Sequence, residues 1–130
     1  MILHVDANTF YASCERLFRP DLDHKPIAVL SNNDGIIIAL NQECKDLGFH
    51  RGDAYFKLRE ECRQKNVTIF SSNYTLYADI SARLTLIYNQ FCPDVEFYSI
   101  DESLSDLEAR KIFRIREEIK KENNRKYCKF

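Results

Sequence analysis

Short apolar runs divide the chain into predicted strands. These runs are ILHV at 2–5, PIAVL at 26–30, IIIAL at 36–40, VTIF at 67–70, VEFYSI at 95–100 and SLSDL at 103–107. Polar or turn-forming residues bound each run, as expected of strands. The segment SNNDG at 31–35 separates two of the runs, and its Asn, Asp and Gly residues favour a turn, so we predict a hairpin there. The residues DE, Asp101 and Glu102, are predicted to form the turn of a second hairpin.

The segments between these strands have helical character. Helices are predicted for residues 9–17, 41–47, 51–65, 74–90 and 108–122. The segment 51–65 is expected to begin with a turn before its helix. Gly48 follows the second helix in the position where glycine commonly ends one. In the fourth helix, apolar residues at 77, 80, 84, 87 and 91 share one face, and Pro93 ends the pattern. Strands and helices in mixed order predict an α+β fold, with helices flanking an α/β-like sheet.

The composition indicates a folded domain without a membrane span. The chain has 130 residues, of which 45% are hydrophobic, enough for a core. No apolar run approaches the roughly 18 residues that a span requires, and the N-terminus lacks a signal-peptide pattern, so we expect a cytoplasmic protein with no membrane partner. The five cysteines show no CxxC spacing, which favours reduced thiols over a zinc site or a disulfide framework.

Charge is distributed unevenly along the chain. Residues 1–107 hold 10 Lys or Arg and 16 Asp or Glu, a net charge of −6, whereas residues 108–130 hold 9 and 4, a net charge of +5. A basic segment of this kind is typical of nucleic-acid binding, and it is equally typical of a solvated helix face. The charge alone leaves both interpretations open.

Three carboxylates stand out by their position. Asp6 follows the first predicted strand, and Asp101 and Glu102 lie at the tip of the second predicted hairpin. Adjacent like charges are costly unless a cation lies close to them. If the two strands are neighbours in one sheet, the three groups converge, and such oxygen ligands suit Mg²⁺ bound together with substrate phosphates. The alternative is a hairpin turn with ordinary surface acids.

Four motifs, in order along the chain, resemble the Y-family translesion DNA polymerases. They are VDANTFYASCERLFRPDL at 5–22, KPIAVLSNNDG at 25–35, FSSNYTLYADIS at 70–81 and FYSIDESLSDL at 97–107. The wording of the second and third motifs is most similar to the UmuC-like branch of that family. The resemblance therefore implies template-directed nucleotidyl transfer in translesion synthesis, as part of SOS DNA repair.

The resemblance also assigns roles to residues of this chain. It implies that Asp6, Asp101 and Glu102 are catalytic and bind two Mg²⁺ ions, for which Mn²⁺ can substitute, together with the backbone carbonyl of Ala7. Nucleotide-binding roles are implied for Asn8, Phe10, Tyr11 and Lys45. Tyr11 matches the residue that excludes a ribose 2′-hydroxyl. For Phe10, packing in the core is as plausible as a role in nucleotide binding.

The chain departs from the family pattern around Lys45. In the segment NQECKDLGF at 41–49, Gln42 replaces a tyrosine common in the family, and Lys45 replaces an arginine. A lysine offers a point charge without the two-pronged geometry of arginine, so a weaker grip on the triphosphate is expected. The UmuC-like branch accepts lysine at this position. Leu40 stands where that branch often has arginine, and no physical reason for this is evident.

The resemblance implies a domain plan. Residues 1–10 and 74–130 match part of the palm and 11–73 match the fingers, whereas no segment matches the thumb or the little finger. We therefore expect the N-terminal part of a polymerase core, inactive by itself. The expected partners are primer–template DNA, deoxynucleotides and accessory polymerase subunits, and an open palm sheet edge would favour a homodimer.

Two other functions remain open from the sequence. Palm-like nucleotide cyclases also place carboxylates on a central hairpin, but they would not require the FYA motif at 10–12 or the fingers segment. The second alternative is a fragment that binds metal, nucleotide or a partner protein without catalysis. Primer extension by this chain beside a longer one distinguishes that fragment from a polymerase.

Overall fold

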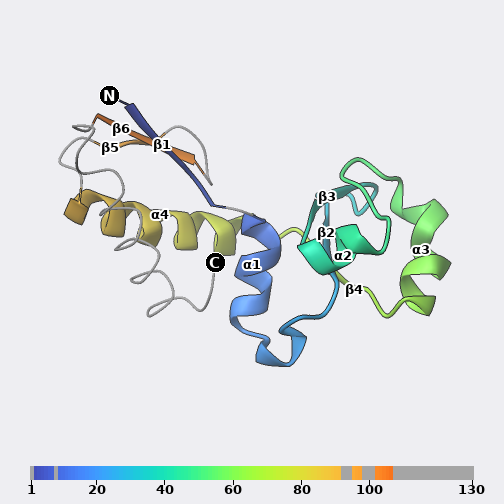
Figure 1. Cartoon of the computed structure of the whole chain (residues 1–130). Coiled ribbons are helices and arrows are strands. Elements are labelled where there is room, and N and C mark those ends of the chain that lie inside the picture. The colour runs from blue at the N-terminus through green and yellow to red at the C-terminus, as the bar shows by residue number, and fades with distance from the viewer. Residues whose placement is uncertain (1, 8, 92–94, 98–101, 107–130) are drawn as a thin grey trace. The chain divides into compact units, whose positions relative to one another are not determined.

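The computed structural model describes residues 2–7, 9–91, 95–97 and 102–106 (Figure 1). The chain divides into two compact units. Unit 1 consists of Met1–Asn8 and Thr75–Phe130, and unit 2 consists of Thr9–Tyr74. The predicted helix at 108–122 and the basic segment at 108–130 lie outside the described residues.

Unit 1 contains a three-stranded antiparallel sheet. Its strands are β1 (Ile2–Asp6), β5 (Val95–Phe97) and β6 (Glu102–Asp106), in the spatial order β1-β6-β5. β6 is therefore the central strand, and it pairs with β1 over five residues and with β5 over three. The antiparallel pairing of β5 and β6 confirms the second predicted hairpin. The prediction was wrong for Glu102, which begins β6 instead of lying in the turn, because it pairs with β1.

Helix α4 (Tyr74–Phe91) is the longest helix that the structure describes. Four of the five apolar positions predicted for its inner face are buried, namely Tyr77, Ile80, Leu84 and Ile87. Spacings of three and four residues place such side chains on one face of a helix, so burial of that face accounts for the helix. Among the helices in the described ranges, none combines the length and apolar character needed to cross a bilayer.

Unit 2 contains a second three-stranded sheet. It comprises β2 (Ile27–Leu30), β3 (Ile37–Leu40) and β4 (Thr68–Ser71), in the order β3-β2-β4. β2 and β3 form the predicted hairpin, whereas β4 lies parallel to β2 on its other side. The helices of this unit are α1 (Phe10–Leu17), a short 3₁₀ turn η1 (Pro20–Leu22), α2 (Gln42–Asp46) and α3 (Tyr55–Gln64).

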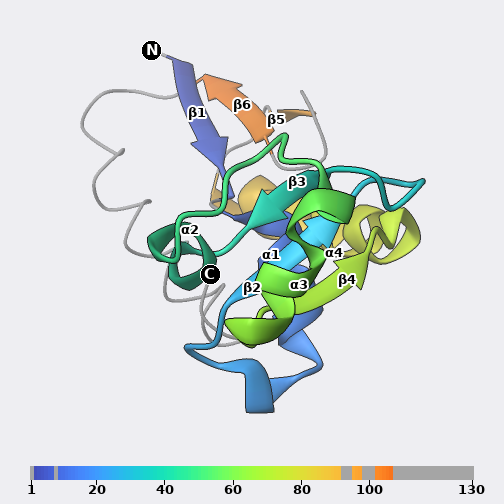
Figure 2. The same cartoon turned by 90° about the vertical axis from the view of Figure 1, so that its right-hand side faces the viewer.

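Helices cover both faces of this second sheet. Figures 1 and 2 show α1 on one side of β2 and α3 on the other. Ala28 and Leu30 of β2 belong to a core cluster that also contains Cys44 of α2 and Cys62 of α3. All four residues of β2 are buried, as expected of a strand covered on both faces.

The three cysteines in the described residues are free, buried thiols: Cys14, Cys44 and Cys62. Gly48 has a φ of +93° directly after Leu47, the C-cap residue of α2, so it ends the helix as predicted.

Candidate active site

The pairing of β1 with β6 brings two of the predicted acidic positions together. Asp6, the last residue of β1, is directly opposite Glu102, the first residue of β6. Directly opposed residues of an antiparallel ladder share one face of the sheet, with Cβ atoms about 5 Å apart. Asp6 is exposed to solvent. The ladder therefore offers a pair of carboxylate positions at one end of the sheet.

The rest of the predicted metal site is described only in part. Ala7, whose carbonyl is the fourth predicted ligand, is half-buried and directly follows β1. Asp101 and Asn8 lie outside the described residues. Within the described ranges, no cluster of three or more His, Cys, Asp or Glu side chains suited to a metal is found. The oxygen donors at Asp6, Ala7 and Glu102 are of the kind that Mg²⁺ prefers, so these residues fit such an ion.

The backbone between β1 and α1 passes through a strained residue. Thr9 has a φ of +50° and a ψ of +41°, which is the left-handed region. A β-branched residue rarely adopts this conformation, which costs on the order of 1–3 kcal/mol. The Thr9 carbonyl accepts a 2.9 Å hydrogen bond from the Ser13 backbone N–H, which begins α1. Strain of this kind is common at functional sites, and here it lies between the candidate residues Asp6 and Tyr11.

Phe10 and Tyr11 have different environments at the start of α1. Phe10 is only 3% exposed, so its ring packs in the interior. Tyr11 is half-buried, and its ring meets that of Tyr74 edge to face, with centroids 5.9 Å apart and planes at 87°. The Phe10 ring lies 5.9 Å from Tyr11 on a tilted plane. These two neighbours restrict the Tyr11 ring, as expected of a side chain that acts by its shape.

Lys45 lies on the exposed side of α2. Among the described residues, none forms a hydrogen bond or ion pair with its side chain. The neighbouring Gln42 donates a 2.8 Å hydrogen bond from Nε2 to Asp46 Oδ1 and so occupies that carboxylate. The Lys45 ammonium is therefore available to an anion such as a phosphate.

Asn41 positions α2, and the sequence did not single it out. It is 5% exposed, and its Oδ1 accepts hydrogen bonds from the backbone N–H groups of Ile27 (2.9 Å) and Cys44 (3.1 Å). Its Nδ2 donates to the Lys25 carbonyl at 2.7 Å. One side chain thus caps α2 and ties it to the start of β2, and Lys45 is carried on that helix. Asparagine before a helical pattern signals a cap, but the ties to β2 depend on tertiary structure.

Comparisons with known proteins identify relatives of this chain. The model of the impB/mucB/samB family matches residues 5–126. The protein UmuC of Salmonella typhimurium is 54% identical over 102 residues, which cover 78% of this chain and 24% of that protein. The DNA polymerase IV of Acetivibrio thermocellus is 32% identical over 134 residues, which cover 94% of this chain and 33% of that protein.

Solved structures share the fold. A ternary complex of the protein Dbh has a TM-score of 0.83 and 23% identity, covering 96% of this chain and 38% of that one. DinB from Sulfolobus solfataricus has a TM-score of 0.84 and 22% identity, with the same coverage. Both similarities establish the α+β fold expected from the sequence.

The relatives are much longer than this chain. The chain spans about a quarter of the length of UmuC and a third of that of the DNA polymerase IV. The family model, in contrast, covers most of this chain, and all four sequence motifs lie within its range. The chain therefore belongs to the impB/mucB/samB family, which confirms its resemblance to the UmuC-like branch of the Y-family polymerases.

Proposed function

We propose that this chain is the N-terminal palm-and-fingers part of a DNA polymerase that extends primers opposite damaged template bases. The observation that carries the proposal is the register of β1 and β6, which sets Asp6 directly opposite Glu102 in a chain of this family. In this proposal, unit 1 belongs to the palm and unit 2 is the fingers. The partners are primer–template DNA, a deoxynucleoside triphosphate and accessory subunits, all in the cytoplasm.

Asp6, Asp101, Glu102 and the carbonyl of Ala7 are proposed to hold two Mg²⁺ ions, or Mn²⁺ in their place. Held by these residues, the ions would supply Lewis-acid activation of a primer hydroxyl and positive charge beside the departing phosphate. Two carboxylates on opposed strands supply hard, anionic oxygens without a long, flexible loop between them. The sheet thereby keeps the ligands at fixed spacing while nucleotides exchange.

Residues of unit 2 are proposed to hold the nucleotide. Lys45 contacts the triphosphate with an ammonium that no described residue engages. Tyr11, restrained by the ring of Tyr74, excludes a 2′-hydroxyl on the sugar. Asn8 and Phe10 complete the proposed site, Phe10 chiefly by supporting Tyr11 from the interior.

Calorimetry tests the proposed metal site in the chain itself. Titration of dATP into the protein with Mg²⁺ present should give a binding signal that Asp6→Ala and Glu102→Ala weaken by at least about tenfold, or about 1.4 kcal/mol. Asp101→Ala should have the same effect. Each variant removes an anionic oxygen ligand, whereas the nucleotide still supplies its own phosphate ligands.

Asp106→Ala is the matched control for that titration. Asp106 is the last residue of the same strand and pairs with Ile2, at the opposite end of the ladder from Asp6 and Glu102. The two positions are four steps apart along the strand, a rise of roughly 13 Å. The control should bind as the native chain does. Equal affinity in the native chain and in Glu102→Ala would overturn the assignment.

A further inference from the structure

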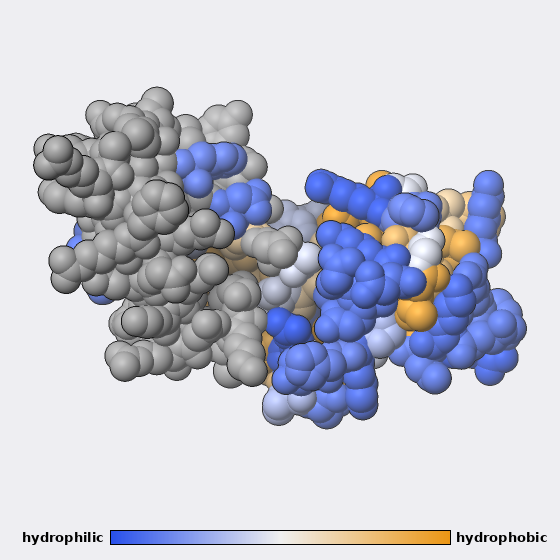
Figure 3. Space-filling view, viewed as in Figure 1, coloured by the Kyte–Doolittle hydropathy of each residue, from blue (hydrophilic) through white to orange (hydrophobic). Residues whose placement is uncertain are grey.

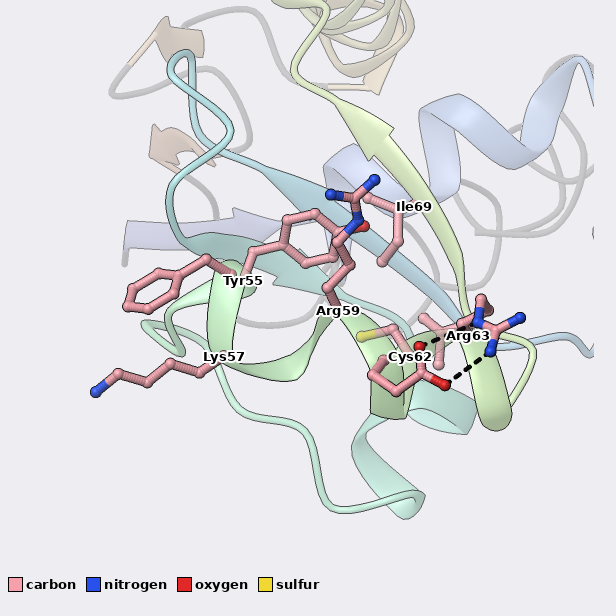
Figure 4. A pocket seen from close by; sticks show the side chains of 9 residues that line it. Tyr55, Lys57, Arg59, Cys62, Arg63 and Ile69 are labelled. Atoms are coloured by element: carbon pink, nitrogen blue, oxygen red, sulfur yellow. Dashed lines mark hydrogen bonds and ion pairs between the residues drawn. The ribbon is translucent and has the colours of Figure 1, made fainter.

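A groove separates α3 from the edge strand β4 in unit 2 (Figure 4). Its cavity has a volume of about 460 Å³. Apolar or weakly polar groups line it from both elements, namely Tyr55 and Cys62 of α3 and Val67 and Ile69 at β4. The same groove is bordered by Phe56, which is 75% exposed. Figure 3 shows apolar surface, in orange, interrupting the polar surface of unit 2.

The outer edge of β4 carries backbone groups that face away from the sheet. β4 is the last strand in the order β3-β2-β4, and within the described residues no strand pairs with its other side. The Thr68 N–H donates to the Pro26 carbonyl at 2.9 Å, toward β2. Backbone groups of successive residues point to opposite edges of a strand. The N–H and C=O groups of Ile69 and Ser71 therefore point outward.

Positive charge borders the groove. Arg63 is engaged by Glu60 through hydrogen bonds of 2.8 and 3.1 Å, which Figure 4 marks with dashed lines. The Lys57 ammonium lies 5.7 Å from the centroid of the Phe56 ring. In the described part of the chain, no hydrogen bond or ion pair engages Arg59. With Glu60 offset by Arg63, the groove keeps two uncompensated positive charges, those of Lys57 and Arg59.

We propose that this groove binds an extended segment of a partner protein as a fourth strand on β4, with apolar and acidic residues at the alternate positions that face α3. In an antiparallel arrangement, each residue opposite Ile69 or Ser71 exchanges two backbone hydrogen bonds with it, as in other cases of strand addition. Every second side chain of the added strand faces α3. The apolar side chains of this set enter the groove, and the acidic ones meet Lys57 and Arg59. A nucleic acid fits less well, because it cannot pair with the alternating N–H and C=O groups of a strand edge.

The test uses a defined probe and a matched pair of variants at Ser71. The probe is a fluorescent eight-residue peptide with blocked ends, Thr-Val-Thr-Glu-Thr-Val-Thr-Glu, which carries valine and glutamate on one face of a strand. Its binding is followed by fluorescence anisotropy. Ser71→Pro removes the outward N–H and should weaken binding at least about tenfold, because proline is tolerated at an edge but blocks pairing. Ser71→Ala keeps the N–H and should bind as the native chain does. Circular dichroism checks that both variants fold.

A second pair of variants tests the charge. Arg59→Glu should weaken peptide binding about tenfold, and the loss should shrink as NaCl is raised, because salt screens exposed charges. Arg51→Glu makes the same change at an exposed arginine outside the groove and should have no effect. This arm does not depend on how well Ser71→Pro folds.

Three results would overturn the proposal. One is equal peptide affinity in Ser71→Pro and Ser71→Ala when both are folded. Another is displacement of the peptide by a single-stranded oligodeoxynucleotide that binds the native chain and Ser71→Pro with equal affinity. That result would make the groove a nucleic-acid site. The third is a dimer in sedimentation that Ser71→Pro dissociates, which would make the occupant a second copy of the chain.

Discussion

The buried side chain of Asn41 stabilises unit 2 and holds α2, the helix that carries the candidate residue Lys45. Asn41→Ala leaves the N–H groups of Ile27 and Cys44 without their acceptor and removes the cap of α2. We expect the free energy of unfolding to fall by about 2–3 kcal/mol, measured by urea denaturation. Asn33→Ala is the control, because Asn33 makes similar hydrogen bonds in an exposed turn and should cost less than about 1 kcal/mol. Equal losses would show that burial does not govern the effect.

Tyr11 should determine the choice of sugar in a complete polymerase that carries this segment. Tyr11→Ala is expected to raise ribonucleotide incorporation, because it removes the ring that would collide with a 2′-hydroxyl. Tyr11→Phe keeps the ring and should keep the discrimination. Primer extension with ribo- and deoxynucleotides measures the ratio. Unchanged discrimination in Tyr11→Ala would make the ring a packing element.

Because two thiols are buried, we predict that the free energy of unfolding falls at alkaline pH. Burial raises the pKa of Cys14 from its usual 9.0 to about 12. Burial, with a smaller contribution from Cys62, raises the pKa of Cys44 to about 12 as well. The unfolded chain loses these protons above pH 9 while the folded chain keeps them, so the free energy of unfolding falls between about pH 9 and about pH 12.

At about pH 10 each of these thiols should lower stability by about 1.4 kcal/mol relative to about pH 8. Urea denaturation at the two pH values, on the native chain and on a Cys14→Ala, Cys44→Ala double variant, measures the difference. The native chain and the double variant have all other titrating groups in common. The free energy of unfolding of the double variant should therefore fall by about 3 kcal/mol less between the two pH values than that of the native chain. An identical loss in both proteins would contradict the assignment.

At the scale of elements, periodicity predicted what each segment forms but not which segments pair. The burial of Tyr77, Ile80, Leu84 and Ile87 follows from the spacing of apolar residues in α4. The hairpin of β2 and β3 was predictable because its turn is local. The parallel pairing of β4 with β2 was not, because a strand pattern carries no information about a distant partner.

The candidate site shows the same division. Asp6 and Glu102 were found from their place beside predicted strands, but their register across β1 and β6 depends on pairing between segments about a hundred residues apart. Asn41 was missed because a single buried polar residue leaves no periodic signal. The burial of Phe10 likewise depends on how α1 packs on its sheet.

At the scale of the whole molecule, the division of the sequence into two units lies near the boundaries predicted for palm and fingers. The fingers were predicted for 11–73, and the compact unit runs from Thr9 to Tyr74. The domain names, the homodimer through an open palm edge and the DNA-binding role of the basic segment at 108–130 stay predictions. The comparisons, which cover about a quarter of UmuC, establish the family and leave activity to experiment.

The chain spans a third of the length of the DNA polymerase IV, so the proposed catalysis is expected to need more of a polymerase than this segment. Phosphoryl transfer relies on positioning and electrostatic stabilisation, and a misplacement of about 1 Å can cost about a hundredfold in rate. The 130-residue chain by itself should therefore not extend a primer at a useful rate. A chimera in which it replaces the matching segment of the Acetivibrio DNA polymerase IV restores a chain of polymerase length.

Primer extension by that chimera tests the proposed role of the opposed acidic pair most directly. We expect the chimera to extend a primer in Mg²⁺, Glu102→Ala to lower the rate at least about a hundredfold, and Asp106→Ala, on the same strand, to leave it near the native rate. Extension by the Glu102→Ala chimera at the native rate would contradict the proposal that the paired positions of β1 and β6 hold the catalytic metals.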